Sequence, residues 1–577
     1  MIKLLLNSFL LLFAISAYSQ INSIEWAGVY SDQNAGLNRI QNLTTDSQGN
    51  IYTTLNYAGT TDVDIQASTL TLTSSGPQDA AIVKHNPDGS IAWANSYGST
   101  EGYCQFNKIY IDNNDDIYAL GTMCCGTIDF DLSANESIIV GDISSSTNII
   151  VKVDGNGNLI FIKHLQQNPF GTIMDLVFAE DGYIYGAGSF QGTVDFDLTD
   201  AVSTLISQPI GATNAVLCKW DTDFSLVWSK QFTTNVGILS NMSVSALEID
   251  SNGNFFISGT FAETYDFDPG AGEFLMTPNT FTQNADYYIL KLNSTGDFVW
   301  AKQMGLGMGE MNITIDLDQQ DNLYITADYL YGYDVDPSDG VFLLESSTSL
   351  YGIFVTKWTN NADFVWAKSF LSTLGMYYNI TEIVDNNSLW ICGKFQGLLD
   401  FNPAPDETNA IDSPQNSAYI FQIDLDGNYL SANAFPSTIN ANILDFEVIA
   451  QDELLIAGYH YGIMDINPGA EVTNFDSGDT EDSFIAKCIF TLPDNIVDQQ
   501  KQDLNIYPNP FHTELRIDAS NHPNSILEIY NSEGKKVHHS SVLTSQINLD
   551  LSGFSDGIYT IRMIGENGTA IRRVIKE

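Results

Sequence analysis

The chain has 577 residues and a formal charge of −49, with 71 Asp and Glu against 22 Lys and Arg. Its 44% apolar and 12% aromatic residues indicate a folded protein and exclude a disordered acidic chain. The charge argues against nucleic acid or an anionic membrane surface as a partner, and favours cations, basic proteins or neutral glycans.

The N-terminus predicts an export signal. Residues 1–19 contain one lysine, an apolar run and the small-residue ending Ala17-Tyr18-Ser19. We expect cleavage between Ser19 and Gln20. The alternative, a membrane anchor, is disfavoured because the apolar run is short and interrupted by polar residues. No later segment is apolar enough to span a bilayer.

A short acidic motif recurs along the chain. VDFDL at 194–198 has siblings in IDFDL, YDFDP, YDVDP, LDFNP and MDINP, with a weaker form at 62–65. The first aspartates stand at positions 62, 129, 195, 266, 334, 400 and 465, which are spaced by 67, 66, 71, 68, 66 and 65 residues. The chain therefore contains seven copies of a repeat.

Each copy contains four strand-like runs, here named A to D in chain order. In the fourth full copy these are 246–250, 255–261, 287–293 and 298–304, bounded by Gly, Asn and Asp turns. A D-type run without a preceding C stands alone at 24–30, and the last copy ends at 490 without its D. We therefore expect an all-β, seven-bladed β-propeller over 20–490, in which 24–30 completes the last blade. A linear solenoid would leave this match unexplained.

The A–B pattern DSNGNFFISGTF and the C–D pattern DYYILKLNSTGDFVWAK resemble the bacterial β-propeller repeat of the SBBP type. The resemblance covers most of the chain and implies its architecture. It implies no catalytic residue.

Positive charge is scarce and regularly placed between 21 and 490. Ten of the thirteen Lys and Arg lie in C or D runs, where we expect them to pair with carboxylates: Lys84, Lys152, Lys219, Lys291, Lys357, Lys487, Lys163, Lys230, Lys302 and Lys368. Exposed pairs of this kind contribute only about 0–1 kcal/mol each.

The six cysteines are too few for a disulfide framework. Cys218, Cys392 and Cys488 lie in apolar runs, which favours burial. Cys104 and the adjacent Cys124-Cys125 could supply one bridge.

Histidines in the repeats are interpreted as structural. His85 and His164 occupy strand positions that other copies fill with different residues, and His460 is the third of the three before 490. We find no nucleophile elbow, phosphate loop or zinc motif.

The repeated DxD motif begins each long B–C connection, so these acidic loops should gather on one face. One hypothesis is a set of Ca²⁺ sites. The favoured alternative is that the aspartates cap loop N–H groups or pair with C-run lysines, while the residue between them packs between blades. The candidate ligands are Asp129, Asp131, Asp195, Asp197, Asp266, Asp268, Asp334 and Asp336.

The composition and charge of the sequence change after residue 490. Residues 491–502 form a polar linker, and 503–577 carry seven Lys and Arg against nine Asp and Glu, which leaves −47 for the rest of the chain. Seven short apolar runs predict a small Ig-like β-sandwich.

Motifs in this tail closely resemble the type A C-terminal sorting domain of the type IX secretion system of Bacteroidota. They are YPNPF (Tyr507, Pro508, Asn509, Pro510 and Phe511), LEIYNSEGKKV, LDLSGFSDGIYTIRM and the terminal RRVIKE. The resemblance implies contact with that secretion machinery, export across both membranes, and a product that is attached to the cell surface or released.

Two functions remain open from the sequence. The leading hypothesis is a secreted or cell-surface module that binds an unknown protein, glycan or cation and is not an enzyme. The alternative is a carbohydrate-active hydrolase or lyase that uses Asp and Glu at the propeller mouth, with Glu101 and Glu310 as first candidates.

Overall fold

The computed structural model describes the chain between residues 20 and 576. It leaves out 33–35, 67, 142–145, 235–236, 238–239, 279–284, 306–311, 331–332, 339, 345–351, 385–386, 405–407, 451, 469–471, 492–504, 508–510, 519–525, 531–535, 542–545, 556 and 566–567. The predicted signal peptide, including Ser19, and most of the predicted linker lie outside the described residues. The chain divides into two compact units, Ser19–Thr491 and one that contains Leu492–Glu577.

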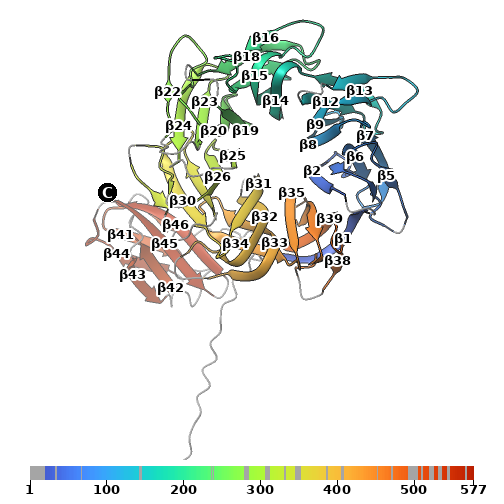
Figure 1. Ribbon diagram of the computed structural model, residues 1–577. Coiled ribbons are helices and arrows are strands. Elements are labelled where there is room, and N and C mark those ends of the chain that lie inside the picture. The colour runs from blue at the N-terminus through green and yellow to red at the C-terminus, as the bar shows by residue number, and fades with distance from the viewer. Residues whose placement is uncertain are drawn as a thin grey trace, which may run out of the picture. The chain divides into compact units, whose positions relative to one another are not determined.

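The first unit is built from antiparallel four-stranded sets, which follow one another in chain order around a common centre (Figure 1). We name the first three sets sheets I to III. Sheet I is β2 (Asn38–Thr45), β3 (Ile51–Tyr57), β6 (Asp79–His85) and β7 (Ile91–Tyr97). Sheet II is β8 (Tyr103–Ile111), β9 (Ile117–Cys124), β12 (Thr147–Val153) and β13 (Leu159–His164). Sheet III is β14 (Gln166–Phe178), β15 (Ile184–Asp195), β17 (Asn214–Trp220) and β18 (Leu226–Phe232).

The pattern continues in sheets IV to VI. Sheet IV is β19 (Met242–Ile249), β20 (Phe255–Phe261), β23 (Asp286–Leu292) and β24 (Phe298–Met304). Sheet V is β25 (Ile313–Leu317), β26 (Leu323–Tyr329), β29 (Gly352–Trp358) and β30 (Phe364–Phe370). Sheet VI is β31 (Met376–Val384), β32 (Ser388–Asp400), β33 (Ala410–Asp424) and β34 (Tyr429–Phe435). In each set the first strand lies at the inner edge (Figure 1).

The last set, sheet VII, joins the two ends of the unit. It contains β35 (Asn440–Ala450), β36 (Glu453–Tyr461) and β39 (Asp482–Thr491), and its fourth strand is β1 (Gln20–Asp32). β1 pairs antiparallel with β39, for example Ile24 with Cys488 and Tyr30 with Ser483. The N-terminal strand therefore pairs with the last strand of this set. One bridge, between Asn416 and Asn440, connects sheets VI and VII.

The core lies between neighbouring sheets. Tyr52 and Ile82 of sheet I pack in one buried cluster with Phe106 and Ile117 of sheet II. A second cluster joins Tyr30 and other residues of sheet VII to residues of sheet I. Since each strand alternates its side chains between the two faces, every sheet contributes to the core on both sides.

The described residues of the tail unit form two sheets with one shared core. The first is β40 (Asn505–Tyr507), β41 (Glu514–Asp518) and β44 (Gln546–Asp550). The second is β42 (Ile526–Tyr530), β43 (Lys536–Ser541), β45 (Gly557–Gly565) and β46 (Gly568–Lys576). Leu515 and Ile517 of the first sheet and Leu527 and Ile561 of the second belong to the same buried cluster. This is the arrangement of a β-sandwich.

Candidate functional site

The DxD motifs lie in short hairpins after the second strand of each set. The first aspartate ends the first short strand, as in β10 (Gly126–Asp129) with β11 (Ile138–Gly141) and β21 (Tyr265–Asp266) with β22 (Leu275–Met276). Similar pairs are β4 (Thr60–Asp62) with β5 (Thr71–Thr73), β27 (Tyr333–Asp334) with β28 (Leu343–Leu344), and β37 (Ile463–Asp465) with β38 (Asn474–Asp476). In sheet III, β16 (Thr204–Ile206) pairs with the end of β15.

The first aspartate of each motif holds its loop closed. Asp266 Oδ1 accepts the backbone N–H groups of Asp268 at 3.0 Å and Phe274 at 2.8 Å. The same pair of bonds, to the residues two and eight or nine positions further on, is made by Asp62, Asp129, Asp195, Asp334, Asp400 and Asp465. These aspartates satisfy N–H groups that a loop leaves without a ladder partner.

The second residue of the motif caps the next turn. Asp268 Oδ1 accepts the N–H of Gly270 at 2.8 Å, and Asn402 makes the equivalent bond to Ala404 at 3.0 Å. Because an amide oxygen accepts this bond as well as a carboxylate does, the copy with Asn402 keeps the same turn. Equivalent bonds are made by Asp64, Asp131, Asp197 and Asp336.

The residue between the two polar positions is buried in every copy. Each of these side chains is at most 1% exposed: Val63, Phe130, Phe196, Phe267, Val335, Phe401 and Ile466. They anchor the loop in the core, as the scaffold interpretation predicts.

The predicted metal ligands therefore already have backbone partners. Within the described residues, no group of three or more His, Cys, Asp or Glu is arranged to hold a metal ion. Calcium binding at Asp129, Asp131, Asp195, Asp197, Asp266, Asp268, Asp334 and Asp336 stays a prediction.

The C-run lysines do pair with carboxylates, but not with the DxD motifs. With the exception of Lys487, each lysine has its partner in the turn between the first two strands of the same sheet. Lys152 Nζ is 3.0 Å from Asp112 Oδ2, and Lys291 Nζ is 3.5 Å from Asp250 Oδ2. Lys84 pairs with Asp46, Lys219 with Asp181, and Lys357 with Asp318. Lys487 pairs with Glu25 of β1 and with Glu453 of β36. The suggestion that these lysines neutralise the DxD loops is therefore wrong, because the lysines reach the turn next to their own strand.

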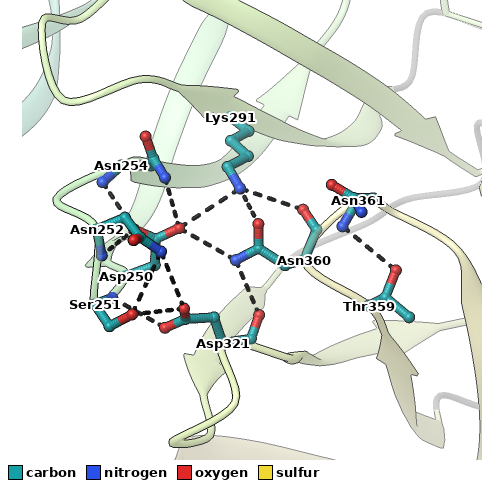
Figure 2. Close-up of polar contacts among 9 residues, drawn as sticks. All are labelled: Asp250, Ser251, Asn252, Asn254, Lys291, Asp321, Thr359, Asn360 and Asn361. Atoms are coloured by element: carbon teal, nitrogen blue, oxygen red, sulfur yellow. Dashed lines mark hydrogen bonds and ion pairs between the residues drawn. The ribbon is translucent and has the colours of Figure 1, made fainter.

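Figure 2 shows how this pairing connects sheets IV and V. Asp250 Oδ1 accepts the N–H groups of Asn252 and Asn254, each at 2.9 Å, and so closes its own turn. Lys291 contacts Asp250 and also donates to the backbone and side-chain oxygens of Asn360 in sheet V. Lys84 and Lys357 likewise reach a backbone oxygen in the next sheet, at Gly155 and Leu425. We call this arrangement the clasp.

A second contact in Figure 2 links the turns themselves. Ser251 donates from its N–H at 2.9 Å and from its hydroxyl at 2.7 Å to the carboxylate of Asp321 in sheet V. Ser47 and Asp115 make the same two bonds between sheets I and II.

The lysines of the fourth strands are placed differently. Lys230 pairs with Asp297 at 3.3 Å, and Lys302 donates to the backbone oxygen of Pro337 at 3.0 Å. Among the described residues Lys163 forms no ion pair within 4.0 Å, but, against the effect of burial, its charge contributes to lowering the pKa of Asp197. The expected carboxylate pairing in this strand is thus found at Lys230 alone among the described contacts.

The innermost strands carry acids that the motif search missed. They are Asp175, Glu248, Asp316, Glu382 and Asp445, and the cation Lys108 lies 3.6 Å from Asp175. Burial raises the pKa of Asp316 to about 6, of Asp445 to about 7 and of Glu382 to about 8, and raises the pKa of Glu248 well above its usual value. The sequence does hold a signal, since Glu248, Asp316 and Glu382 each stand two residues before the first turn position.

Three of these acids bridge neighbouring sheets, and one of them, Asp316 of sheet V, accepts the N–H of Ile383 in sheet VI. Asp175 Oδ2 accepts the N–H of Leu247 at 3.2 Å, and Asp445 Oδ2 accepts the N–H of Leu43 at 2.7 Å. The Asp445 bond joins sheet VII to sheet I.

His85 is a satisfied structural histidine, as predicted. It is fully buried, its Nε2 lies 2.8 Å from the Tyr30 hydroxyl, and its Nδ1 lies 3.1 Å from the Gly89 oxygen. Burial lowers the pKa of His85 to about 4, and it also lowers the pKa of His460 to about 4 and that of His164.

Cys218, Cys392 and Cys488 are buried and free, as predicted. Cys124 and Cys125 are bonded to each other, and Cys104 is buried and free. Of the pairings left open by the sequence, the structure has the adjacent one.

The enzyme hypothesis has one described candidate. Glu101 is exposed in a turn, and its N–H donates to Ser99 Oγ at 3.3 Å. Glu310 lies outside the described residues.

The sorting motif begins in β40 at Tyr507 and ends at Phe511, which is fully buried in the core of the tail unit. Pro508, Asn509 and Pro510 lie outside the described residues. In the described part of the chain no helix is both long and apolar enough to cross a bilayer.

Residues 505–577 match the family described as the secretion system C-terminal sorting domain. The tail therefore is a type IX sorting domain, as its motifs indicate, and the protein is exported to the cell surface or the extracellular space. This address implies contact with the type IX secretion machinery. No curated protein matches the chain.

Solved structures give only distant likenesses. One is PorZ, a surface component of the type IX secretion system of Porphyromonas gingivalis, with 10% identity, a TM-score of 0.25, and coverage of 93% of this chain and 81% of that chain. A glycoside hydrolase of family 32 from Bifidobacterium adolescentis has 8% identity, a TM-score of 0.26, and coverage of 81% and 82%. The extracellular domain of BT4673 from B. thetaiotaomicron has 12% identity, a TM-score of 0.15, and coverage of 97% and 100%.

Proposed function

We propose that residues 20–490 form a closed seven-bladed β-propeller that acts outside the cell as a rigid, non-enzymatic binding module, followed by a linker at 491–502 and a sorting domain at 503–577. The observation that carries the proposal is the use of the motif acids. In all seven copies the first aspartate accepts two backbone N–H groups of its own loop. Acids engaged in this way hold a scaffold together and leave its surface free to bind.

Closure is supported by contacts that repeat across the joint between sheets VII and I. The indole N–H of Trp93 in sheet I donates to the Gly155 oxygen in sheet II at 3.3 Å. Trp26 of β1 makes the equivalent bond to the Pro87 oxygen in sheet I, also at 3.3 Å. Together with the β1–β39 pairing, this shared indole bond supports closure of the ring.

The function is tested on the protein as it is secreted. We expect binding to a protein or glycan array and no turnover across a panel of polysaccharides. Turnover that is abolished by Glu101→Gln or Glu310→Gln would contradict the proposal and establish the hydrolase or lyase alternative. A variant that lacks Gln20–Asp32 tests closure: it should aggregate or melt earlier, because the edge of β39 becomes exposed.

A further inference from the structure

The junction between sheets III and IV lacks two contacts that are present between sheets I and II and between sheets IV and V, namely the lysine clasp and the serine-to-aspartate link. The Asp175–Leu247 bond and the Lys230–Asp297 ion pair still cross this junction. The turn positions correspond because Gly182, Gly253 and Asp321 each donate their N–H to the first residue of the turn, which is Ala179, Asp250 and Asp318 respectively. Sheet III thus has Ala179 where its neighbours have a capping aspartate.

The link between adjacent turns is missing here as well. At the next junction, Ser251 is the second residue of its turn and bonds to Asp321, the fourth residue of the following turn. At the junction between sheets III and IV, these two positions are occupied by Glu180 and Gly253. A glutamate and a glycine cannot form the serine-to-carboxylate bonds, so the two turns are not tied together.

The lysine of this junction is also turned away from sheet IV. Lys219 pairs with Asp181 at 3.0 Å, and its ammonium lies 3.8 Å from the ring centre of Tyr183 and 4.9 Å from that of Tyr185. Among the described residues it forms no hydrogen bond to the sheet IV turn that contains Ser294, the counterpart of Asn360.

A pocket of about 690 Å³ fills the space that these replacements leave. This volume lies within the range of small-molecule sites, roughly 300–1,000 Å³. Its apolar wall includes Tyr185 and Phe255, whose ring centres are 4.8 Å apart across the two sheets. Its acids are Glu180, Asp181 and Asp250, of which Asp181 and Asp250 already pair with Lys219 and Lys291, so Glu180 is the carboxylate left for a ligand. None of the described residues that line it is Lys or Arg.

The lining fits a cation on an apolar stem. Tyr185 and Phe255 are only 3% and 1% exposed, so they offer no open platform on which a sugar ring could stack. Glu180 is exposed at the rim, where an ammonium or guanidinium group would meet it. Lys219 provides an example in the same molecule of an ammonium held by a carboxylate and aromatic rings. The charge of −47 outside the tail attracts the same class of partner.

We propose that this pocket binds a lysine or arginine side chain of a basic protein or peptide. The inference rests on the proposed function, since it names the ligand class and the site of the binding module.

The test measures fluorescence anisotropy of fluorescein-labelled tri-arginine with the secreted protein, and compares tri-citrulline, which lacks the charge. Glu180→Gln should weaken binding about threefold and should not disturb folding, because the side chain is exposed. The double variant Glu180→Ser with Gly253→Asp recreates the serine-to-aspartate link. Gly253 has φ +76°, close to the φ of 58° at Asp321, and a Cβ there would meet Ser294 at an ordinary 3.4 Å.

We expect the double variant and tri-citrulline each to weaken binding about tenfold or more. Glu136→Gln, which removes an exposed acid from another loop, should leave binding within about twofold. Equal binding by the double variant would overturn the pocket assignment while leaving the binding module intact. Equal binding of tri-citrulline, or displacement by maltohexaose, would overturn the ligand class. Turnover in the polysaccharide screen would instead defeat the proposed function.

Discussion

The junction between sheets IV and V and the junction between sheets III and IV use the same turns but different contacts. In the first, Asp250 and Lys291 are almost completely buried, with side chains 0% and 6% exposed. In the second, Asp181 is 46% exposed and its lysine partner does not cross to the next sheet. The difference shows that the backbone repeat is maintained without the clasp. A junction that lacks the clasp has room for a pocket.

The largest expected effect separates these two junctions. Asp250→Ala should lower the free energy of unfolding of the first unit by about 3–5 kcal/mol, because it leaves the buried Lys291 charge without its partner. Asp181→Ala should cost only about 0–1 kcal/mol, as expected for an exposed pair. Urea unfolding followed by tryptophan fluorescence measures both. Equal losses would mean that the two junctions do not differ in energy.

The DxD loops offer a second comparison, between capping of backbone N–H groups and calcium binding. Asp266→Ala should cost about 1–3 kcal/mol because two N–H groups lose their acceptor. Asp266→Asn should cost less than about 0.5 kcal/mol, since both bonds go to Oδ1, which an amide retains.

Thermal melts with calcium and with EDTA complete this test. If the loops are only capped, EDTA leaves the midpoint unchanged for the wild type and both variants. A lower midpoint in EDTA, with Asp266→Asn as weak as Asp266→Ala, would establish the metal site.

A third comparison concerns one position in sheets I and V. Asn56 of sheet I donates to the Phe106 oxygen at 3.1 Å and accepts the Phe106 N–H at 2.9 Å. Asp328, the sixth residue of β26 as Asn56 is of β3, is 1% exposed, and neither carboxyl oxygen has a hydrogen-bond partner of good geometry. Burial raises the pKa of Asp328 to about 8, opposed weakly by the backbone of Asn312.

Because the folded-state pKa of Asp328 is raised, its neutral form stabilises the fold at low pH, and this stability is lost as pH rises from about 4 to about 8. Asp328→Asn does not titrate. Its free energy of unfolding should exceed that of the wild type by about 1 kcal/mol at pH 8, and this gain should vanish near pH 4. A variant that is less stable at every pH would show that the carboxyl has a favourable partner.

The smallest expected effect lies at the inner strands. The pKa of Glu382 is raised from 4.5 to about 8, chiefly by burial and then by Asp316, Asp445 and Glu447. The same sign applies, so stability falls between pH 4.5 and about 8 as Glu382 ionises. Glu382→Gln should gain less than about 1 kcal/mol at pH 8. Glu136→Gln is the control, and a pH-independent gain would exclude titration of Glu382 as the cause.

Most of the architecture was predictable from local patterns. Alternating apolar residues and Asp or Asn with Gly at the turns placed the strands of the fourth copy at 246–304, close to β19, β20, β23 and β24. The same reasoning identified 24–30 as the partner of the last set, and the tail motifs gave the export address. Strand periodicity and turn chemistry depend on neighbours in the sequence, so one chain suffices to recognise them.

Tertiary structure decided which partner each polar group takes. The sequence placed Lys291 beside carboxylates, but only packing set Asp250 and Asn360 as its contacts, the second of which lies 69 residues away. The sequence alone also could not distinguish capping from metal binding at the DxD motifs. Nor could it reveal that Ala179 and Gly253 lie at the same junction. Contacts between sheets join residues about one repeat apart, and their geometry depends on how whole sheets pack against each other.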